Sequence, residues 1–149
     1  MRADYHVHTE LSDDSDYAME NVIEDAITKG LDEICFTDHV DYGVKKDWDE
    51  PGGMVYRKGG AGEPAEMPLA NVHYPTYYET FKVMRALYGD EITLKLGLEF
   101  DMQAHTIEKY EKLFARYPFD FIILSVHEVE DKEFWTQDFQ RGRTQQEYN

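Results

Sequence analysis

Apolar residues along this chain follow two spacings, one typical of strands and one typical of helices. Short runs that are continuous or alternate with polar residues indicate strands, whereas apolar residues three and four apart indicate amphipathic helices. We therefore expect strands over residues 2–7, 31–38, 92–100 and 119–126, and helices over 17–29, 76–88, 103–116 and, at the end of the chain, 142–149. The run at 119–126 is typical of a strand buried on both faces.

Residues at the ends of these segments support the expected bounds. Gly30 and Gly89 follow the first and second helices and are typical of helix stops. The expected N-caps are Ser15 or Asp16 for the first helix, Thr76 with Glu79 in a capping box for the second, and Asp101 for the third.

The order of these elements predicts the fold class. Strands that alternate with helices are typical of an α/β protein with a parallel sheet and right-handed crossovers. The 149 residues suffice for one domain, but four βα units are half of an eight-fold barrel, which needs about 250 residues. The chain is therefore either a small open sheet or the first part of a longer barrel. It stops at Asn149 inside an expected helix, so we expect C-terminal truncation.

The segment 43–75 differs from the rest in composition. It holds six of the ten glycines and four of the five prolines, a density that disfavours regular structure. A loop of this length is typically functional, so we interpret it as an insertion that acts as a lid. Its cations, which either close over a substrate or lie in solvent, are Lys45, Lys46, Arg57 and Lys58.

Charge and cysteine content exclude several partners. The 31 acidic against 15 basic residues give a net charge of −16, which argues against nucleic acid as a partner. No apolar run is long enough for a membrane span or a signal peptide. The single Cys35 cannot form an internal disulfide, so we expect a cytoplasmic protein. Bound divalent metals would offset the negative charge near an anionic substrate.

Metal-competent side chains end each expected strand. In parallel α/β sheets such groups converge at the carboxyl ends of the strands. These strand ends carry His6 and His8, His39, Glu99, and His127. His6 and His8 are two residues apart, so both rings point to one side of a strand. His73 and His105 lack this context, and we expect neither to bind metal.

Glu99 is the candidate for a bridging ligand. Its two oxygens can span two ions, which lie about 3.5–4 Å apart in two-metal sites, although a buried salt bridge is the alternative. Imidazole and carboxylate ligands together suit Zn, Mn or Fe. Asp38 either accepts a hydrogen bond from a ligand histidine or is a turn residue, and we expect Asp13 to be solvated.

Four motifs in order resemble the PHP (polymerase and histidinol phosphatase) superfamily, and within it the histidinol-phosphatase branch. They are HVHTELSDDS, FTDH, GLEFD and LSVHEV. The resemblance implies a distorted (β/α)7 barrel, of which residues 1–149 are a partial domain with about four βα units. It also implies two or three metal ions per complete site. The ligands that it implies are His6 and His8 for the first ion, Glu99 as the bridge, His127 for the second ion, and Asp14 with His39 for the third.

The chain departs from the family pattern after His127. The family completes its site with a later histidine and a C-terminal Asp-x-His motif, and residues 128–149 contain no histidine. Each ion would therefore lack one ligand, which implies that the intact protein is longer.

These features predict a metal-dependent phosphomonoester hydrolase that uses a metal-activated water, with no catalytic residue beyond the metal ligands. The resemblance implies L-histidinol phosphate as substrate and histidine biosynthesis as pathway. Arg141 and Arg143 could contact the phosphate, or lie in a solvated turn.

Three alternatives remain. One is a PHP-type phosphoesterase with another substrate, such as a nucleotide or a sugar phosphate. Another is a non-catalytic α/β module that forms homo-oligomers through open strand edges. An amidohydrolase-type enzyme fits poorly, because Lys95 lies in the middle of a strand.

Overall fold

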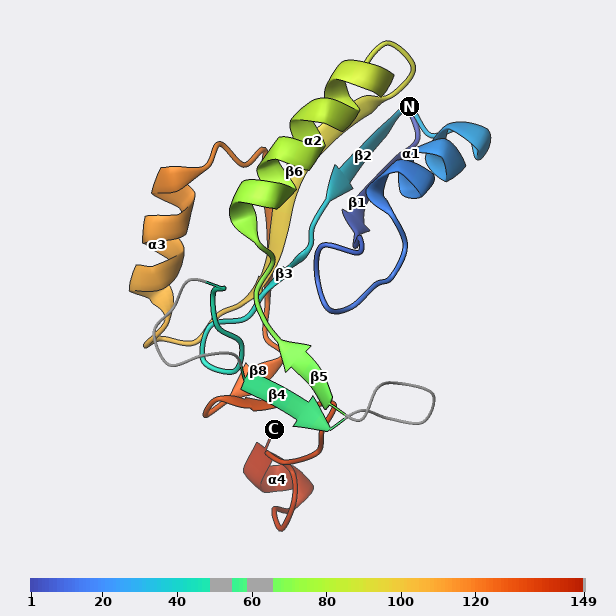
Figure 1. Ribbon diagram of the computed structural model, residues 1–149. Coiled ribbons are helices and arrows are strands. Elements are labelled where there is room, and N and C mark those ends of the chain that lie inside the picture. Colours follow the sequence, from blue (N-terminus) through green and yellow to red (C-terminus); the bar gives the residue numbers. More distant parts are fainter. Residues whose placement is uncertain (49–54, 59–65, 149) are drawn as a thin grey trace.

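The protein, described by a computed structural model, is built on one parallel sheet (Figure 1). The structure describes residues 1–48, 55–58 and 66–148. The sheet contains β1 (Ala3–Val7), β2 (Glu33–Phe36), β3 (His39–Val40), β6 (Thr93–Asp101) and β7 (Phe121–Ser125). All of its paired strands are parallel, and β3 continues β2 along the same side of β6, with His39 opposite Glu99. The α/β class with a parallel sheet is thus confirmed.

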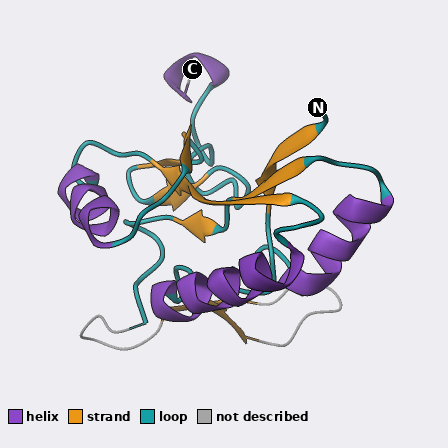
Figure 2. Cartoon of the chain, turned by 90° about the horizontal axis from the view of Figure 1, so that it is seen from above, coloured by secondary structure: helices purple, strands orange, loops and turns teal. Residues whose placement is uncertain are grey.

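Three helices connect these strands and lie on one side of the sheet (Figure 2). They are α1 (Met19–Thr28), α2 (Tyr74–Tyr88) and α3 (Ile107–Arg116). Alternate residues of β6 lie in the hydrophobic core together with side chains of these helices, namely Leu94, Leu96, Leu98 and Phe100. The residues between them face the opposite side, where the candidate site lies. Among the described residues, no helix is long and apolar enough to cross a membrane.

The segment 43–75 contains regular structure that its composition did not predict. β4 (Val55–Lys58) and β5 (Glu66–Leu69) form an antiparallel pair, and α2 begins at Tyr74 within the expected loop. Pro75 lies in the first turn of α2, where proline is tolerated because its missing N–H has no partner in the helix. Residues 49–54 and 59–65, and the side chains of Arg57 and Lys58, lie outside the described part, so the lid remains a prediction.

The expected helix caps are wrong. The backbone N–H of Met19 donates to Glu10 at 2.7 Å, so Glu10 satisfies the start of α1 in place of Ser15 or Asp16. Thr76 lies inside α2, where its hydroxyl is 2.7 Å from the ring of His73. No side-chain cap bond precedes α3, because Asp101 faces the candidate site instead.

β7 is less buried than its apolar sequence predicted. The side chains of Phe121, Leu124 and Val126 at and after this strand are 37%, 56% and 60% exposed. The reason is position: β7 and β1 are the two edges of the described sheet, so neither has a strand beyond it. An apolar run predicts a strand buried on both faces when the strand lies inside a sheet, whereas β7 lies at an edge of the described sheet.

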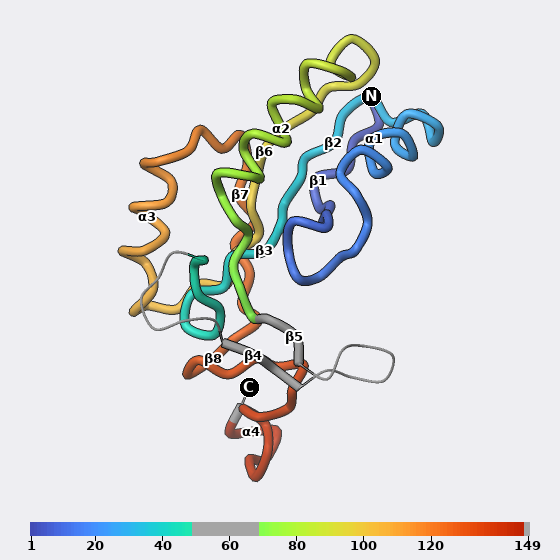
Figure 3. The backbone as a smooth tube through the Cα atoms, in the orientation of Figure 1, coloured from blue at the N-terminus to red at the C-terminus, as the bar shows by residue number. Residues whose placement is uncertain are grey.

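The chain after β7 folds back below the sheet (Figure 3), where β8 (Glu128–Val129) lies near β4 and β5 (Figure 1). β8 and β9 (Lys132–Glu133) form a hairpin whose two turn residues, Glu130 and Asp131, have φ values of 57° and 56°. Two positive values at these positions indicate a type I′ turn. The helix expected near 142–149 is the short α4 (Gln145–Tyr148).

Candidate metal centre

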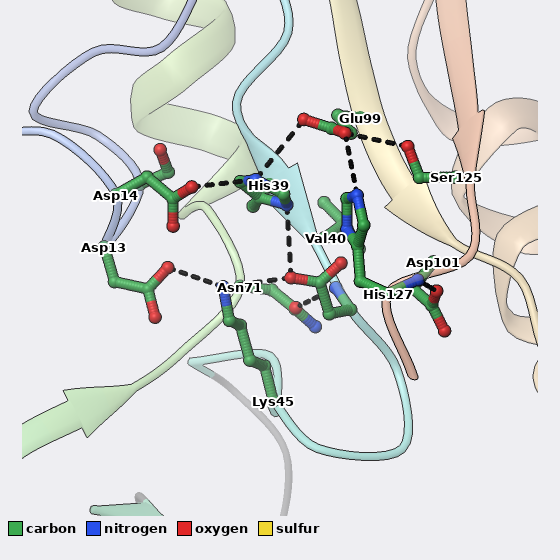
Figure 4. A network of polar contacts seen from close by, with 12 residues as sticks. Asp13, Asp14, His39, Val40, Lys45, Asn71, Glu99, Asp101, Ser125 and His127 are labelled. Atoms are coloured by element: carbon green, nitrogen blue, oxygen red, sulfur yellow. Dashed lines mark hydrogen bonds and ion pairs between the residues drawn. The ribbon is translucent and has the colours of Figure 1, made fainter. Parts of the chain in front are cut away.

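The carboxyl ends of the strands surround a cavity of about 350 Å³. Its lining includes every residue proposed from the sequence as a metal ligand: His6, His8, Asp14, His39, Glu99 and His127. These side chains come from β1 and the loop after it, from β3, from β6, and from the end of β7, so segments far apart in sequence meet at one rim. The convergence predicted from the strand ends is therefore present, and Figure 4 shows part of it.

Glu99 lies at the centre of the cluster, buried to 2% exposure. Its Oε2 is 2.7 Å from His6 Nε2, and 3.3 Å from both His8 Nε2 and His39 Nε2. Its Oε1 is 3.4 Å from His127 Nε2 and accepts a hydrogen bond from Ser125 Oγ at 2.7 Å. The two oxygens thus face different histidines, which is the arrangement that a bridging carboxylate needs.

An irregularity in β1 aims its two histidines. The register between β1 and β2 shifts between Asp4 and Val7, as in a β-bulge. Bulges re-aim side chains and are common next to active sites. His6 and His8 both reach Glu99, although His8 lies just beyond the end of β1.

Asp14 is held beside His39 by the loop that follows β1. Asp14 Oδ2 is 2.8 Å from His39 Nε2, and the ring of His39 stacks on that of His8 at 4.8 Å between centroids. The loop is fixed by the buried Asp38, which accepts bonds from Thr9 N at 2.8 Å and Ser12 Oγ at 2.6 Å. Asp38 therefore anchors this loop, and the described contacts do not pair it with a ligand histidine.

Asp101 positions the other end of the site. Its Oδ1 accepts the backbone N–H groups of His127 and Glu128, the latter at 3.0 Å. This bond fixes the chain where it leaves β7, so the His127 ring points back toward Glu99 (Figure 4). The sequence placed Asp101 at a helix cap, and its position opposite Ser125 in the sheet explains the difference.

Three further buried polar residues line the cavity: Asp41 and Glu128, which were not named from the sequence, and Lys45, which was named as a cation over the substrate or in solvent and is buried. Asp41 Oδ2 lies 3.3 Å from His39 Nδ1, and Lys45 Nζ lies 2.9 Å from the same oxygen. Lys45 also donates to Asp13 at 2.6 Å, so Asp13 is paired and not simply solvated. Glu128, 2% exposed, accepts a bond from Gln103. Of Asp41 and Glu128, Asp41 had the clearer sequence signal, because it follows His39 by two positions at the end of a strand.

Burial and charge set the protonation states of the site without metal. Burial raises the pKa of Glu99 and Asp14, but their histidine neighbours outweigh it and hold both below their usual values, that of Asp14 at about 2. Burial lowers the pKa of His39, but Asp14 and Asp41 outweigh it and raise it to about 10. The carboxylates are therefore ionised at neutral pH, whereas His39 must lose a proton when it binds a metal.

Glu128 behaves in the opposite way. Burial, helped by the nearby carboxylates of Asp41 and Asp101, raises its pKa to about 9. Glu128 is therefore a neutral acid at pH 7 in the metal-free protein.

The residues present fit a divalent metal. Three triads have ligand atoms within 4.8 Å of one another: His6, His8 and Glu99; His8, Asp14 and His39; and His39, Asp41 and His127. Two buried ring nitrogens, His8 Nδ1 and His39 Nδ1, have no hydrogen-bond partner among the described atoms. The mixture of imidazole and carboxylate donors suits Zn, Mn or Fe.

The other residues singled out from the sequence lie away from this cavity lining. Arg141 pairs with Asp138 at 3.2 Å, and Arg143 pairs with Glu130 at 2.9 Å. Contact of these two arginines with a substrate phosphate remains a prediction. His105 pairs with Asp131 at 2.8 Å, also outside the lining.

The chain is similar in sequence to known phosphatases. The chain is 30% identical over 134 residues to a histidinol-phosphatase of Lactococcus lactis subsp. lactis, covering 90% of this chain and 42% of that protein. A "Probable histidinol-phosphatase" of Deinococcus radiodurans is 25% identical over 124 residues, covering 83% and 41%. The chain therefore spans less than half the length of these relatives.

Solved structures show the same fold. The crystal structure of the L. lactis histidinol phosphate phosphatase, complexed with Zn, L-histidinol and phosphate, matches with a TM-score of 0.68 over 89% of this chain and 42% of that one, at 30% identity. A structure from Listeria monocytogenes matches with a TM-score of 0.62 at 18% identity, over 85% of this chain and 45% of that one, and supports the fold alone. The PHP domain model matches residues 4–149, so this chain belongs to the PHP domain family, as its motifs indicated.

Proposed function

We propose that this chain carries the greater part of the metal centre of a phosphomonoester hydrolase, and that its substrate is L-histidinol phosphate. One observation carries the proposal: the Nε2 atoms of four histidines gather around the two oxygens of a single buried glutamate. Buried carboxylate with several imidazoles at a strand-end rim is the donor set of a divalent metal site. The L. lactis relative, solved with Zn, L-histidinol and phosphate, supports the choice of reaction.

In this proposal His6 and His8 would hold the first of two or three ions, Glu99 would be shared between it and the ion of His127, and Asp14 with His39 would hold a third. The metal is Zn, Mn or Fe, and when bound it supplies an activated water and a counter-charge for phosphate. The chain contributes the orientation of these ligands, through Asp38 behind the loop of Asp14 and Asp101 behind His127. No further catalytic residue is assigned.

The remaining wall of the cavity supports a cationic substrate. Glu128, Glu133 and Trp135 line it beyond the candidate ligands, and Lys45 is the one lysine or arginine among the described lining residues. An indole and carboxyl oxygens, which accept hydrogen bonds from an ammonium group whether ionised or neutral, suit an alcohol that carries such a group, for example L-histidinol. We place the reaction in histidine biosynthesis and, with Cys35 free and buried, in the cytoplasm.

The direct test is phosphate release from L-histidinol phosphate by the protein in its full-length form, loaded with Zn²⁺ or Mn²⁺. We expect turnover that is lost in the His8→Ala variant and is slower on AMP and glucose 6-phosphate. Faster turnover of either of those esters would contradict L-histidinol phosphate as the substrate but would support phosphomonoester hydrolysis as the reaction. Equal phosphate release by the chain and by His8→Ala, on every ester, would contradict the proposed hydrolase.

A non-catalytic metal-binding module is the second candidate. Residues 128–149 provide no further histidine, and β1 and β7 are edge strands of the described sheet. Such edges pair readily with a second chain, so this candidate also predicts homo-oligomers. Bound zinc without turnover, together with a concentration-dependent dimer in sedimentation, would favour it over the hydrolase.

A further inference from the structure

Asp41 and Lys45 form a buried charged pair directly behind the candidate ligand His39. Asp41 is 4% and Lys45 5% exposed. Lys45 reaches back to Asp41 Oδ2 at 2.9 Å, while its own backbone N–H donates to the carbonyl of Asp41 at 2.9 Å. The backbone N–H of Asp41 donates in turn to Asn71 Oδ1 at 2.8 Å. Side chain and main chain of Asp41 are thus both held in place.

Both ring nitrogens of His39 lie close to carboxylate oxygens. Nε2 faces the cavity, 2.8 Å from Asp14 Oδ2 and 3.3 Å from Glu99 Oε2. Nδ1 faces the other way, 3.3 Å from Asp41 Oδ2 but without a well-angled hydrogen bond. Because Lys45 holds that oxygen, Nδ1–H has a fixed carboxylate oxygen 3.3 Å away as its nearest acceptor.

Neutral imidazole carries its proton on one nitrogen only, so an acceptor at Nδ1 leaves the lone pair on Nε2. Metal-bound histidines commonly donate their other N–H to a carboxylate, which fixes both tautomer and ring orientation. We propose that Asp41, clamped by Lys45, is a positioning residue that holds His39 with Nδ1–H toward Asp41 and Nε2 toward the metal. This inference rests on the proposed metal centre and adds a role that the sequence motifs do not contain.

The competing reading makes Asp41 a ligand, because its carboxylate also forms a triad with His39 and His127. The two readings differ in what the carboxylate must provide. A positioning residue needs an acceptor oxygen, which an asparagine retains, whereas a ligand needs the negative charge. Asp13 provides the matched control, since it is the other carboxylate on Lys45 and its described bonds do not include a histidine.

The test is calorimetric titration of Zn²⁺ into the wild-type chain and into Asp41→Ala, Asp41→Asn and Asp13→Ala, each checked for folding by circular dichroism. We expect Asp41→Ala to weaken zinc binding by about 10–100-fold, as loss of an orienting partner does. Asp41→Asn and Asp13→Ala are expected to weaken it only by about threefold or less. Equal losses of zinc affinity in Asp41→Asn and Asp41→Ala would show that Asp41 is a ligand. A loss in Asp13→Ala equal to that in Asp41→Ala would show that Asp41 acts only through its negative charge, and would overturn the positioning role.

Nitrogen NMR of the zinc-loaded chain gives a second readout that a purely structural role would not move. We expect His39 to carry its proton on Nδ1 in the wild-type chain and to lose this preference in Asp41→Ala. A proton on Nε2 of the wild-type His39 would overturn the inference. If the wild-type chain binds no zinc, the proposed centre fails as well, whereas zinc binding without phosphate release leaves the positioning role standing.

Discussion

The two faces of β6 divide the tasks of the protein between alternate residues of one strand. On the face toward the helices, Leu94, Leu96, Leu98 and Phe100 are all buried in the core, and the ring of Phe100 lies 4.1 Å from that of Tyr110 in α3. On the other face, the same strand presents Lys95, Gly97, Glu99 and Asp101. A strand repeats every two residues, so the two sets are separated by the thickness of the sheet.

Stability and chemistry therefore depend mainly on different side chains of this strand. The apolar face contributes hydrophobic burial, which depends on shape and volume. The polar face holds Glu99 at the end of the strand, where parallel sheets leave room for ligands. Truncation of the apolar side chains should therefore act mainly on unfolding, and substitution of the candidate ligand Glu99 mainly on metal binding.

The largest effect is expected from Leu98→Ala on the core face. Leu98 is fully buried, so its truncation should lower the free energy of unfolding by about 2–5 kcal/mol. Leu87→Ala, at a leucine of α2 that is 63% exposed, is the control and should cost about 0.5 kcal/mol or less. Urea unfolding of the metal-free chain measures both. Equal midpoints for the two variants would show that the core face is not the source of stability.

Next is Glu99→Gln, which keeps the shape of the side chain and removes its charge. We expect zinc affinity to fall by about 100-fold or more, since loss of a ligand exceeds the 10–100-fold cost of losing a partner behind one. Glu33→Gln makes the same change near the start of β2, where Glu33 bonds to Tyr5, and should leave zinc affinity unchanged. Calorimetric titration compares them, and similar affinities would remove Glu99 from the centre.

Gly97→Ala tests how tightly the polar face of β6 is packed, because no side chain fits at Gly97. A Cβ there would lie 2.6 Å from the carbonyl oxygen of Phe121 and 2.9 Å from Cys35 Sγ. The neighbouring strand would have to move, so we expect a loss of about 1–3 kcal/mol in urea unfolding. A variant as stable as the wild-type chain would show that β6 and β7 are packed more loosely than described.

The smallest expected effect, taken per pH unit, is the change of the free energy of unfolding with pH. The folded pKa of Glu128, about 9, lies above its usual value, so between about pH 4.5 and pH 9 the folded state binds more protons than the unfolded state. Stability of the metal-free chain should therefore fall as pH rises through this window, by at most about 1.4 kcal/mol per pH unit from this group. His39 adds a loss of the same sign from about pH 6.5 to pH 10.

Glu128→Gln isolates the first contribution. Glutamine resembles the neutral acid, so the variant should lose stability less steeply than the wild-type chain in urea midpoints measured from about pH 6 to pH 9 with EDTA. Its remaining slope belongs to His39 and other groups. Parallel slopes for variant and wild type would mean that Glu128 is already ionised in the folded protein at neutral pH.

The sequence predicted the sheet and the rim of the site because both depend on local patterns. Period-two and helical spacings placed the four long strands and three helices, and strand ends placed His6, His8, His39, Glu99 and His127. Parallel strands bring their carboxyl ends together whatever their loops do. The geometry of the rim therefore follows once the order of elements is known.

The missed features depend on contacts between segments that local patterns do not report. Lys45 belongs to a glycine-rich segment whose composition predicted a loop, and only the folded chain brings it between Asp13 and Asp41. The exposure of Leu124 depends on whether another strand follows β7 in the sheet. Glu10 caps α1 from nine residues away, outside the positions that a capping motif covers.

Anomalous diffraction from crystals of the chain grown with Zn²⁺ tests the metal centre most directly. We expect peaks at the zinc edge between Glu99 and the Nε2 atoms of its surrounding histidines, with His39 Nδ1 turned toward Asp41. Zinc found only at His73 or His105, or no peak within bonding distance of Glu99, would contradict it.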